Sequence, residues 1–366
     1  MTAIMAAKAS SMWLTRFISY LTRCFHFYCF FVIFSVFLWS VSICNNFWQF
    51  LTMAQAMLII NPISGTAKKT GLDVKVEKAM SKAGYDLDVR FTTCRGDATR
   101  LASEAVDKGY DVVLAAGGDG TVNETAQALC GSEITFGIIP SGSGNGLARH
   151  IGIPVSVDAA LDVVARGIVA RCDYGTVNNL PFFCTFGVGF DAAVSHSFAK
   201  QSRRGLFTYL KSALTQYLRY QPDTYTISAN GKILTERAFV VACCNASQYG
   251  NNAYIAPKAS ITDGLLDIII IHQGSPIDTA MVGMDLFTGY IDSNTLIHSL
   301  RAPAAVIYRP NEGPAHIDGE PMILDDIMDI KCHRHGLNIF IPGDKEQFRP
   351  LVTPVRSLWR NIFSLR

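Results

Sequence analysis

Short apolar runs alternate with amphipathic segments through the first half of the chain. The apolar runs predict buried strands over 57–60, 87–92, 111–115 and 134–139. Helical spacing of the polar and apolar positions predicts helices over 73–83, 97–106, 122–129 and 147–150. Because strands and helices alternate, this half of the chain is typical of a parallel sheet with helices on both faces.

The pattern changes after about residue 170, where short runs with strand character dominate. We expect strands over 177–186, 224–228, 239–244, 265–271, 304–308 and 337–341, and helices over 206–220 and 277–290. Asn230-Gly231 favours a tight hairpin turn. The chain is therefore expected to place an α/β domain at 53–172 beside an antiparallel β domain at 173–345, with a substrate cleft between them.

Both ends of the chain have a different character. Residues 24–67 contain no Asp, Glu, Lys or Arg, and residues 27–43 are apolar enough to span or nearly span a bilayer. Two interpretations of residues 1–52 stay open: a hydrophobic membrane anchor, or an extension ahead of a true start at Met53. The tail at 346–366 is basic and amphipathic, so it either lies on an anionic membrane surface or docks on the protein.

Composition narrows the class of protein. The chain has 366 residues and a net charge of +2, which gives no electrostatic case for binding nucleic acid. Its ten cysteines form no CxxC pair, which argues for neither a zinc site nor a disulfide framework. A phosphate-binding domain belongs where nucleotides are. We therefore expect the protein at the cytoplasmic face of a membrane, either peripheral or anchored by its N-terminal segment.

The most informative stretch is the glycine-rich turn after the third strand, Gly117-Gly118-Asp119-Gly120-Thr121. A strand that ends in tight glycines and opens a helix presents unopposed backbone N–H groups, which suit a phosphate. Asp119 places a carboxylate beside such a ligand, so it binds a metal, takes a proton or simply caps the helix. Similar small-residue loops follow the first and fourth strands, at 61–66 and 140–146. The carboxyl ends of parallel strands gather such loops at one edge of the sheet.

These loops do not match the two best-known nucleotide fingerprints. The chain has no GxxxxGK[ST], and Gly142-Ser143-Gly144 lacks the last glycine of GxGxxG. Three acidic positions stand out in the second half: Asp191 after a strand, the turn Asp263-Gly264, and Asp318-Gly319-Glu320. Each of them is also explained by a plain turn. The oxygen-rich turn at Asp263 could hold Mg²⁺ or Ca²⁺.

Five motifs in this order and spacing resemble the diacylglycerol kinase and sphingosine kinase superfamily, particularly its compact bacterial lipid kinases. They are Asn61-Pro62-x-Ser64-Gly65, the run from Gly117 to Glu124, Pro140-x-Gly-Ser-Gly-Asn145, Asp263-Gly264-x-Leu-Asp267 and Asp318-Gly319-Glu320. The likeness covers residues 57–342. It implies a phosphofructokinase-like α/β domain followed by an antiparallel β-sandwich, with ATP bound in the cleft.

The same resemblance implies the residues of the site. Nucleotide would be bound by Asn61, Pro62, Ser64, Gly65, Thr92, Gly117, Gly118, Gly120, Thr121, Asn123 and Ser143. Asp119 or Glu320 would accept the proton of the acceptor hydroxyl, and Asp191 would contact the lipid. Asp263 and the Leu265 carbonyl would hold a structural Mg²⁺. Gly146 stands where many bacterial members have Asp, which leaves the lipid substrate open.

The activity implied by the resemblance is that of a lipid kinase that uses ATP and Mg²⁺ in phospholipid metabolism. Its substrate would be diacylglycerol or a sphingoid or ceramide-type lipid at a membrane surface. Gly-Gly-Asp-Gly is shared with NAD kinases and phosphofructokinases, so a kinase for a soluble substrate is one alternative. A non-catalytic regulator that binds lipid or nucleotide is the other, and a homodimer stays open.

Overall fold

The computed structural model describes residues 53–64, 71–199, 217, 220–250, 252–291 and 294–343. The described residues from Ala54 onward form one compact unit. The hydrophobic segment, Gly65, most of the helix expected at 206–220 and the basic tail lie outside the described residues. Among the helices that are described, none is long and apolar enough to cross a bilayer.

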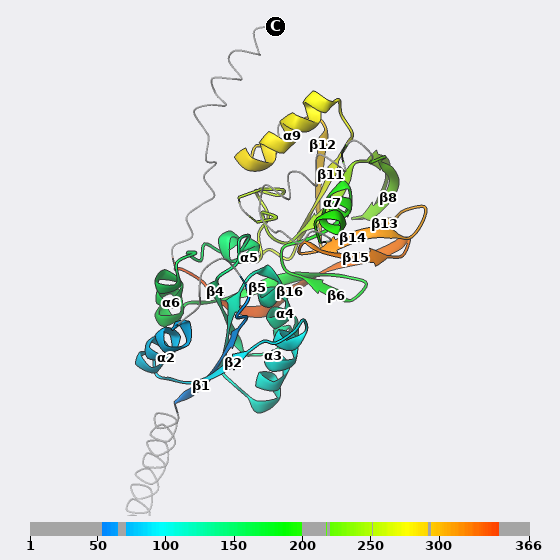
Figure 1. Ribbon diagram of the computed structural model, residues 1–366. Coiled ribbons are helices and arrows are strands. Elements are labelled where there is room, and N and C mark those ends of the chain that lie inside the picture. The colour runs from blue at the N-terminus through cyan, green and yellow to red at the C-terminus, as the bar shows by residue number, and fades with distance from the viewer. Residues whose placement is uncertain are drawn as a thin grey trace, which may run out of the picture. The chain divides into compact units, whose positions relative to one another are not determined.

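The first half of the chain forms the predicted α/β domain. Its parallel strands are β1 (Ala54–Ile60), β2 (Tyr85–Phe91), β3 (Val112–Gly117) and β4 (Thr135–Pro140), in the order β2-β1-β3-β4. Its helices are α2 (Leu72–Lys82), α3 (Asp97–Lys108), α4 (Asp119–Leu129), α5 (Gly146–His150) and α6 (Val157–Arg166). Helix α2 packs on α6 and α3 packs on α4, and Figure 1 shows the two pairs on opposite sides of the strands.

Burial along the strands accounts for this arrangement. Every residue of β3 is buried, and so are the last five residues of β1, as expected for strands covered by helices on both faces. Helix α3 buries Ala98, Leu101, Ala102 and Ala105, one apolar stripe at helical spacing. The strand order reverses between β1 and β3, so the loops after these two strands diverge at the place where such sheets bind ligands.

The second half of the chain forms a β-sandwich. One of its sheets has the order β12 (Ile297–Ala302), β11 (Leu266–Ile271), β10 (Val240–Cys244), β7 (Thr185–Gly189), β14 (Gly313–Ile317) and β15 (Glu320–Leu324). Facing it are β16 (Ile327–Phe340), β13 (Ala304–Tyr308), β8 (Asp223–Ala229) and β9 (Lys232–Ala238). Buried side chains of both sheets, among them Phe186, Val241 and Ile307, form one core between them. The predicted fold class is confirmed.

Four further elements complete the described chain: β5 (Val169–Val177), β6 (Leu180–Phe182), α7 (Phe190–Ala199) and α9 (Pro276–Thr288). Helix α9 begins with a capping box formed by Ser275 and Asp278. Its Val282 packs with Ile269 and Ile271 on the outer face of β11. This helix therefore covers the side of the sheet that faces away from the sandwich core.

Strand β16 belongs to both domains. Its first residues, 327–331, pair antiparallel with β13, and Asn338 and Ile339 near its end pair parallel with β4. Strand β5 pairs with β16 along most of its length. One ten-stranded sheet therefore runs through both domains, and the boundary expected between residues 172 and 173 falls inside β5.

The elements differ from the expected ones in several places. A single strand over 177–186 is wrong because Asn178 and Asn179 take φ values of 47° and 67° and turn the chain from β5 into β6. Helix α4 begins at Asp119, three residues before the expected start. Strands β5, β9, β12, β14 and β15 and helices α6 and α7 were not expected. Three of them, β9, β12 and β15, bury at most one residue each, so they lack a continuous apolar run.

Candidate active site

Asp119, in the first turn of α4, joins two of the glycine loops. Its Oδ2 accepts a hydrogen bond from the backbone N–H of Asn145 at 2.9 Å, and its Oδ1 accepts one from the N–H of Gly146 at 2.6 Å. The cap position of α4 is Gly118, and no side chain caps it there. The Asp119 carboxylate therefore holds the loop after β4 against the loop after β3, instead of capping its own helix.

The two loops approach each other at backbone distance. A Cβ atom on Gly142 would lie 2.5 Å from the Cα of Gly118, and one on Gly144 would lie 2.5 Å from Asp119 Oδ2. A Cβ on Gly117 would lie 2.4 Å from the Cβ of Thr121. Only glycine permits this packing. The bare backbone that results fits a polyphosphate, because N–H groups can approach it without a side chain between.

The loop after β1 is attached to the same region. Asn61 donates from its backbone N–H to the carbonyl of Ala116 at 3.1 Å and from Nδ2 to Thr121 Oγ1 at 3.1 Å. The Ser64 hydroxyl folds back on the carbonyl of Asn61 at 3.2 Å. Pro62 is exposed beside them. The structure thus brings the first and second predicted nucleotide loops together through one backbone and one side-chain hydrogen bond of Asn61.

The remaining predicted nucleotide residues lie at the same edge of the sheet. Thr92, directly after β2, is buried and donates its backbone N–H to the carbonyl of Ile60 at 2.9 Å. Ser143 is exposed at the tip of the loop after β4. Gly120 lies in the first turn of α4. Apart from Gly65, every predicted nucleotide residue therefore lies at or directly after the carboxyl end of a parallel strand, or in the first turns of α4.

Asp318 brings the second domain to these loops. Asp318 and Gly319, with φ of 49° and 84°, form the two-residue turn of the β14–β15 hairpin. The Asp318 carboxylate accepts the three successive backbone N–H groups of residues 183–185 at 2.8–2.9 Å and the Asn123 side-chain amide at 2.6 Å. Burial raises the pKa of the Asp318 carboxyl, while these four hydrogen bonds act in the opposite direction.

Glu320, at the start of β15, keeps a carboxylate that is open to solvent. Its Oε1 would lie 3.7 Å from a Cβ atom on Gly120, so it faces the glycine-rich turn. Its Oε2 lies 3.3 Å from Nη2 of Arg95, and 43% of the side chain is exposed. In contrast to Asp119, the Glu320 carboxylate accepts no backbone N–H group within the described residues, so its oxygens remain accessible to a ligand.

Two carboxylates shape the loop that carries Arg95. Asp97 Oδ2 accepts hydrogen bonds from the hydroxyl and the backbone N–H of Thr93 at 2.6 and 2.7 Å, and these bonds hold the pKa of Asp97 well below its usual range. Glu124, from α4, accepts the backbone N–H of Gly96 at 3.0 Å. The last residue of the motif that starts at Gly117 therefore supports the start of α3.

Asp191, the predicted lipid contact, is buried at the start of α7. Its Oδ2 lies 3.0 Å from both His316 Nε2 and the hydroxyl of Tyr249. Because the N–H of Gly319 donates to His316 Nδ1 at 3.4 Å, the ring proton lies on Nε2 and points to Asp191. His316 thus connects Asp191 to the hairpin that carries Glu320.

The predicted metal residues lie at the turn before β11. Asp263 Oδ2 forms a short ion pair with Nη2 of Arg301, and its Oδ1 accepts the N–H of Leu265 at 3.0 Å. Nε of Arg301 also lies 3.2 Å from Asp267 Oδ1. Both oxygens of Asp263 are engaged, so in this arrangement the turn does not fit a Mg²⁺ cage, and the positive charge comes from Arg301. The structural Mg²⁺ stays a prediction.

Sequence reasoning missed four residues that build this site: Gly142, Asn145, Asp318 and Arg95. The first three stand inside the motifs quoted above, so their places in the loops were a usable signal. Arg95 has no such signal, because only the fold brings it to Glu320, 225 residues away in the sequence.

Comparisons with known proteins match both domains of the chain. A family model described as "Diacylglycerol kinase catalytic domain" matches residues 55–177, and one described as "YegS C-terminal NAD kinase beta sandwich-like domain" matches residues 184–325. The diacylglycerol kinase of Bacillus subtilis (strain 168) is 27% identical over 303 residues, which cover 81% of this chain and 99% of that protein. A "Probable lipid kinase YegS-like" of Pseudomonas syringae pv. syringae (strain B728a) is 30% identical over 313 residues, covering 80% and 95%.

The same fold is found in a solved structure. The crystal structure of a diacylglycerol kinase from Bacillus anthracis str. Sterne superimposes with a TM-score of 0.63 at 22% identity. The match covers 79% of this chain and 97% of that one. Both domains are therefore shared with that protein.

Proposed function

The chain belongs to the family of diacylglycerol kinases and YegS-like lipid kinases, and on this basis we propose that it transfers the γ-phosphoryl group of ATP to a lipid hydroxyl. The observation that carries the proposal is the pairing of two carboxylates around one turn. Asp119 holds the glycine loops together, while Glu320 faces Gly120 from the other domain. Phosphoryl transfer needs alignment and charge neutralisation more than covalent chemistry, and this arrangement supports both.

We assign different roles to the two carboxylates. Glu320 is the proposed proton acceptor, because its carboxylate is exposed and, within the described part of the chain, pairs with the Arg95 side chain alone. Asp119 is a positioning residue, because both of its oxygens hold backbone N–H groups of the loop after β4. Mg²⁺ bound together with ATP would supply charge neutralisation at the phosphate oxygens.

Among lipid acceptors we favour diacylglycerol. The B. subtilis relative is a diacylglycerol kinase by name. A sphingoid base would bring an amine to Asp191, but that carboxylate already accepts hydrogen bonds from His316 and Tyr249. An incoming amine would have to replace buried donors, which is costly. Acting on such a lipid places the protein at a membrane surface, and its use of ATP places it on the cytoplasmic side.

The test is a phosphorylation assay with γ-labelled ATP and Mg²⁺. The full chain and a chain that begins at Met53 are each given diacylglycerol, monoacylglycerol, ceramide or a sphingoid base in mixed micelles, with Glu320→Gln as the control. Label in one lipid, absent from the control, supports the proposal and identifies the substrate. Label transferred to NAD instead would favour the soluble-substrate alternative. Bound nucleotide without label in any acceptor would favour a regulatory protein.

A further inference from the structure

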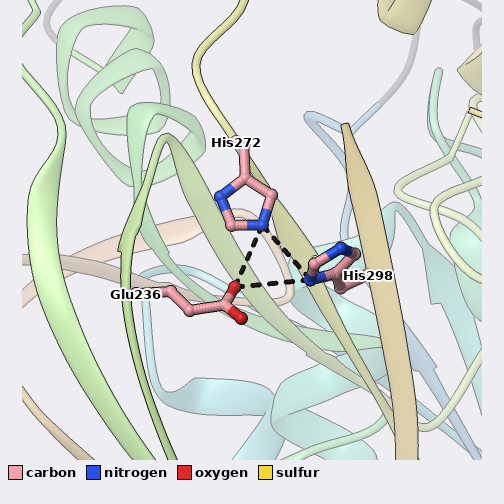
Figure 2. Close-up of side chains that lie close together, drawn as sticks. All are labelled: Glu236, His272 and His298. Atoms are coloured by element: carbon pink, nitrogen blue, oxygen red, sulfur yellow. Dashed lines mark hydrogen bonds and ion pairs between the residues drawn. The ribbon is translucent and has the colours of Figure 1, made fainter. Parts of the chain in front are cut away.

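Three side chains from separate segments converge where the edges of the two sandwich sheets meet. Glu236 lies on β9 and His298 on β12, the edge strands of the two sheets, and His272 directly follows β11. Figure 2 shows the carboxylate and both imidazole rings pointing toward one another. None of these residues belongs to the motifs of the active site, so the proposed kinase reaction does not account for them.

The distances within this cluster match the edges of a metal coordination sphere. Glu236 Oε2 lies 3.0 Å from His272 Nε2 and 3.5 Å from His298 Nδ1, and the two nitrogens lie 3.4 Å apart. In a tetrahedral zinc site with bonds of about 2.0–2.1 Å, neighbouring ligand atoms are separated by about 3.3 Å. The three distances in this cluster, 3.0, 3.5 and 3.4 Å, are close to that separation.

The position of the proton on the His272 ring leaves a nitrogen lone pair that a cation can bind. His272 Nδ1 lies 3.2 Å from the carbonyl of Arg237, which can only accept, so Nδ1 carries a proton. In the neutral ring, Nε2 then presents a lone pair to Glu236 and His298. A backbone carbonyl on the far ring nitrogen is also the usual partner of a histidine that binds a metal.

Glu236 Oε2 supplies a second, independent observation. This oxygen is shielded from solvent, and within the described chain no donor is aligned with it in a hydrogen bond, despite the close approach of His272 Nε2. A buried carboxylate oxygen without a hydrogen bond is costly. A cation between the three ligand atoms would remove that cost.

We propose that Glu236, His272 and His298 bind one Zn²⁺ ion, with water at the fourth position. Two imidazoles and a carboxylate are a common ligand set for this metal. Bound there, the ion cross-links β9 of one sheet to the segment after β11 and to β12 of the other, and so stabilises one edge of the sandwich. The competing explanation is a doubly protonated His272 that forms an ion pair with Glu236.

The experiment measures metal binding by the full chain after chelation and dialysis. We expect one Zn²⁺ per chain with a dissociation constant of about 1 μM or lower. Co²⁺ at the same site should give the visible absorption of a tetrahedral ion with nitrogen and oxygen ligands. Zn²⁺ should also raise the melting temperature, because an ion that binds only the folded state stabilises it.

Two variants and a matched control tie the binding to these residues. Glu236→Gln and His298→Ala should each weaken Zn²⁺ binding by about 100-fold and remove the Co²⁺ absorption. His298 is 57% exposed, so its replacement leaves the fold intact. His335→Asn changes a histidine outside the cluster, at a φ of 54° that asparagine tolerates, and should bind as the wild type does.

Either of two results would overturn the proposal. One is a wild-type chain that binds neither Zn²⁺ nor Co²⁺ more tightly than about 10 μM. The other is full binding by both cluster variants. Neither result depends on kinase activity, so the zinc site and the proposed function fail or hold separately.

Discussion

The side-chain amide of Asn123 donates a hydrogen bond of 2.6 Å to the carboxylate of Asp318, across 195 residues of chain. Asn123 lies on α4 in the nucleotide domain, and Asp318 forms the turn two residues before Glu320. Because Asp318 also accepts the N–H groups of residues 183–185, one carboxylate fixes the hairpin relative to α4.

A double-mutant cycle on this pair should reveal coupling. Asn123→Ala and Asp318→Asn are each expected to lower the free energy of unfolding by about 1–3 kcal/mol, because buried hydrogen-bonding groups lose their partners. The double variant should lose less than the sum, with a coupling of about 1 kcal/mol in urea unfolding. The exposed hydroxyl pair Thr226 and Thr235, 3.0 Å apart, is the control, with coupling of about 0.5 kcal/mol or less. Strict additivity at Asn123 and Asp318 would contradict the prediction.

Nucleotide affinity and turnover should separate the two carboxylates of the site. Glu320→Gln should lower kcat by about 10²–10⁴-fold and leave the dissociation constant of ATP unchanged, as expected for a proton acceptor. Asp119→Asn should weaken ATP binding as well, because its amide NH₂ would face the N–H of Asn145 or Gly146. Calorimetry and steady-state rates measure both quantities. Undiminished turnover in either variant would remove that residue from its assigned role.

Adding one methyl group at Gly142 should push the loop after β4 away from the loop after β3. Gly142→Ala places a Cβ atom 2.5 Å from the Cα of Gly118, and backbone cannot give way cheaply. We expect ATP affinity to fall at least about tenfold, because the N–H groups of both loops lose their alignment. Gly283→Ala in α9 is the control, since its Cβ would meet nothing within 4 Å and alanine favours a helix. Equal ATP binding by the two variants would show that the close approach is not needed.

Asp97 should make stability depend on acid pH. Its pKa in the folded protein is lowered, first by the Thr93 hydroxyl, so it stabilises the fold above its unfolded pKa of about 4. That contribution is lost as pH falls below this value toward the folded pKa. The difference in urea midpoint between the wild type and Asp97→Asn should be present at pH 7 and shrink at pH 3. A difference that is equal at both pH values would contradict this account.

Arg301 offers a test of the predicted Mg²⁺ site. Arg301→Ala removes the positive charge between Asp263 and Asp267 and should lower the free energy of unfolding by about 1–3 kcal/mol. Mg²⁺ without ATP should then raise the melting temperature of the variant and not that of the wild type. A wild type stabilised by Mg²⁺ would instead favour the metal site that the sequence predicts.

Local features of the sequence predicted the nucleotide domain well. Strand β3 is one apolar run followed by glycines. Its burial and the start of the next helix, α4, both follow from residues that are adjacent in the sequence. The role of Asp119 was left open because its partners, Asn145 and Gly146, lie in another loop. Asp is one of the residues preferred as a helix N-cap. Only the approach of the second loop changes that role.

Contacts between strands that are distant in the sequence could not be predicted from local sequence patterns. Strand β9 lies at a sheet edge and buries only its last residue, so its sequence gives no apolar run. The cysteines, without a CxxC pair, gave no argument for zinc, and His272 and His298 are 26 residues apart, a spacing that is not typical of a metal site. The pairing of β11 with β12 brings them together, and pairing between sheet edges is a property of the whole fold.

The shared strand β16 sets a condition on how this protein is made. Residues 327–340 leave the ribosome long after β4, yet Asn338 and Ile339 pair with β4 of the nucleotide domain. A nascent nucleotide domain therefore has one edge of its sheet exposed until β16 has been synthesised. Chains that stop before residue 327 would keep every glycine loop and still present an open edge to other chains, so truncation products should aggregate rather than act as small kinases.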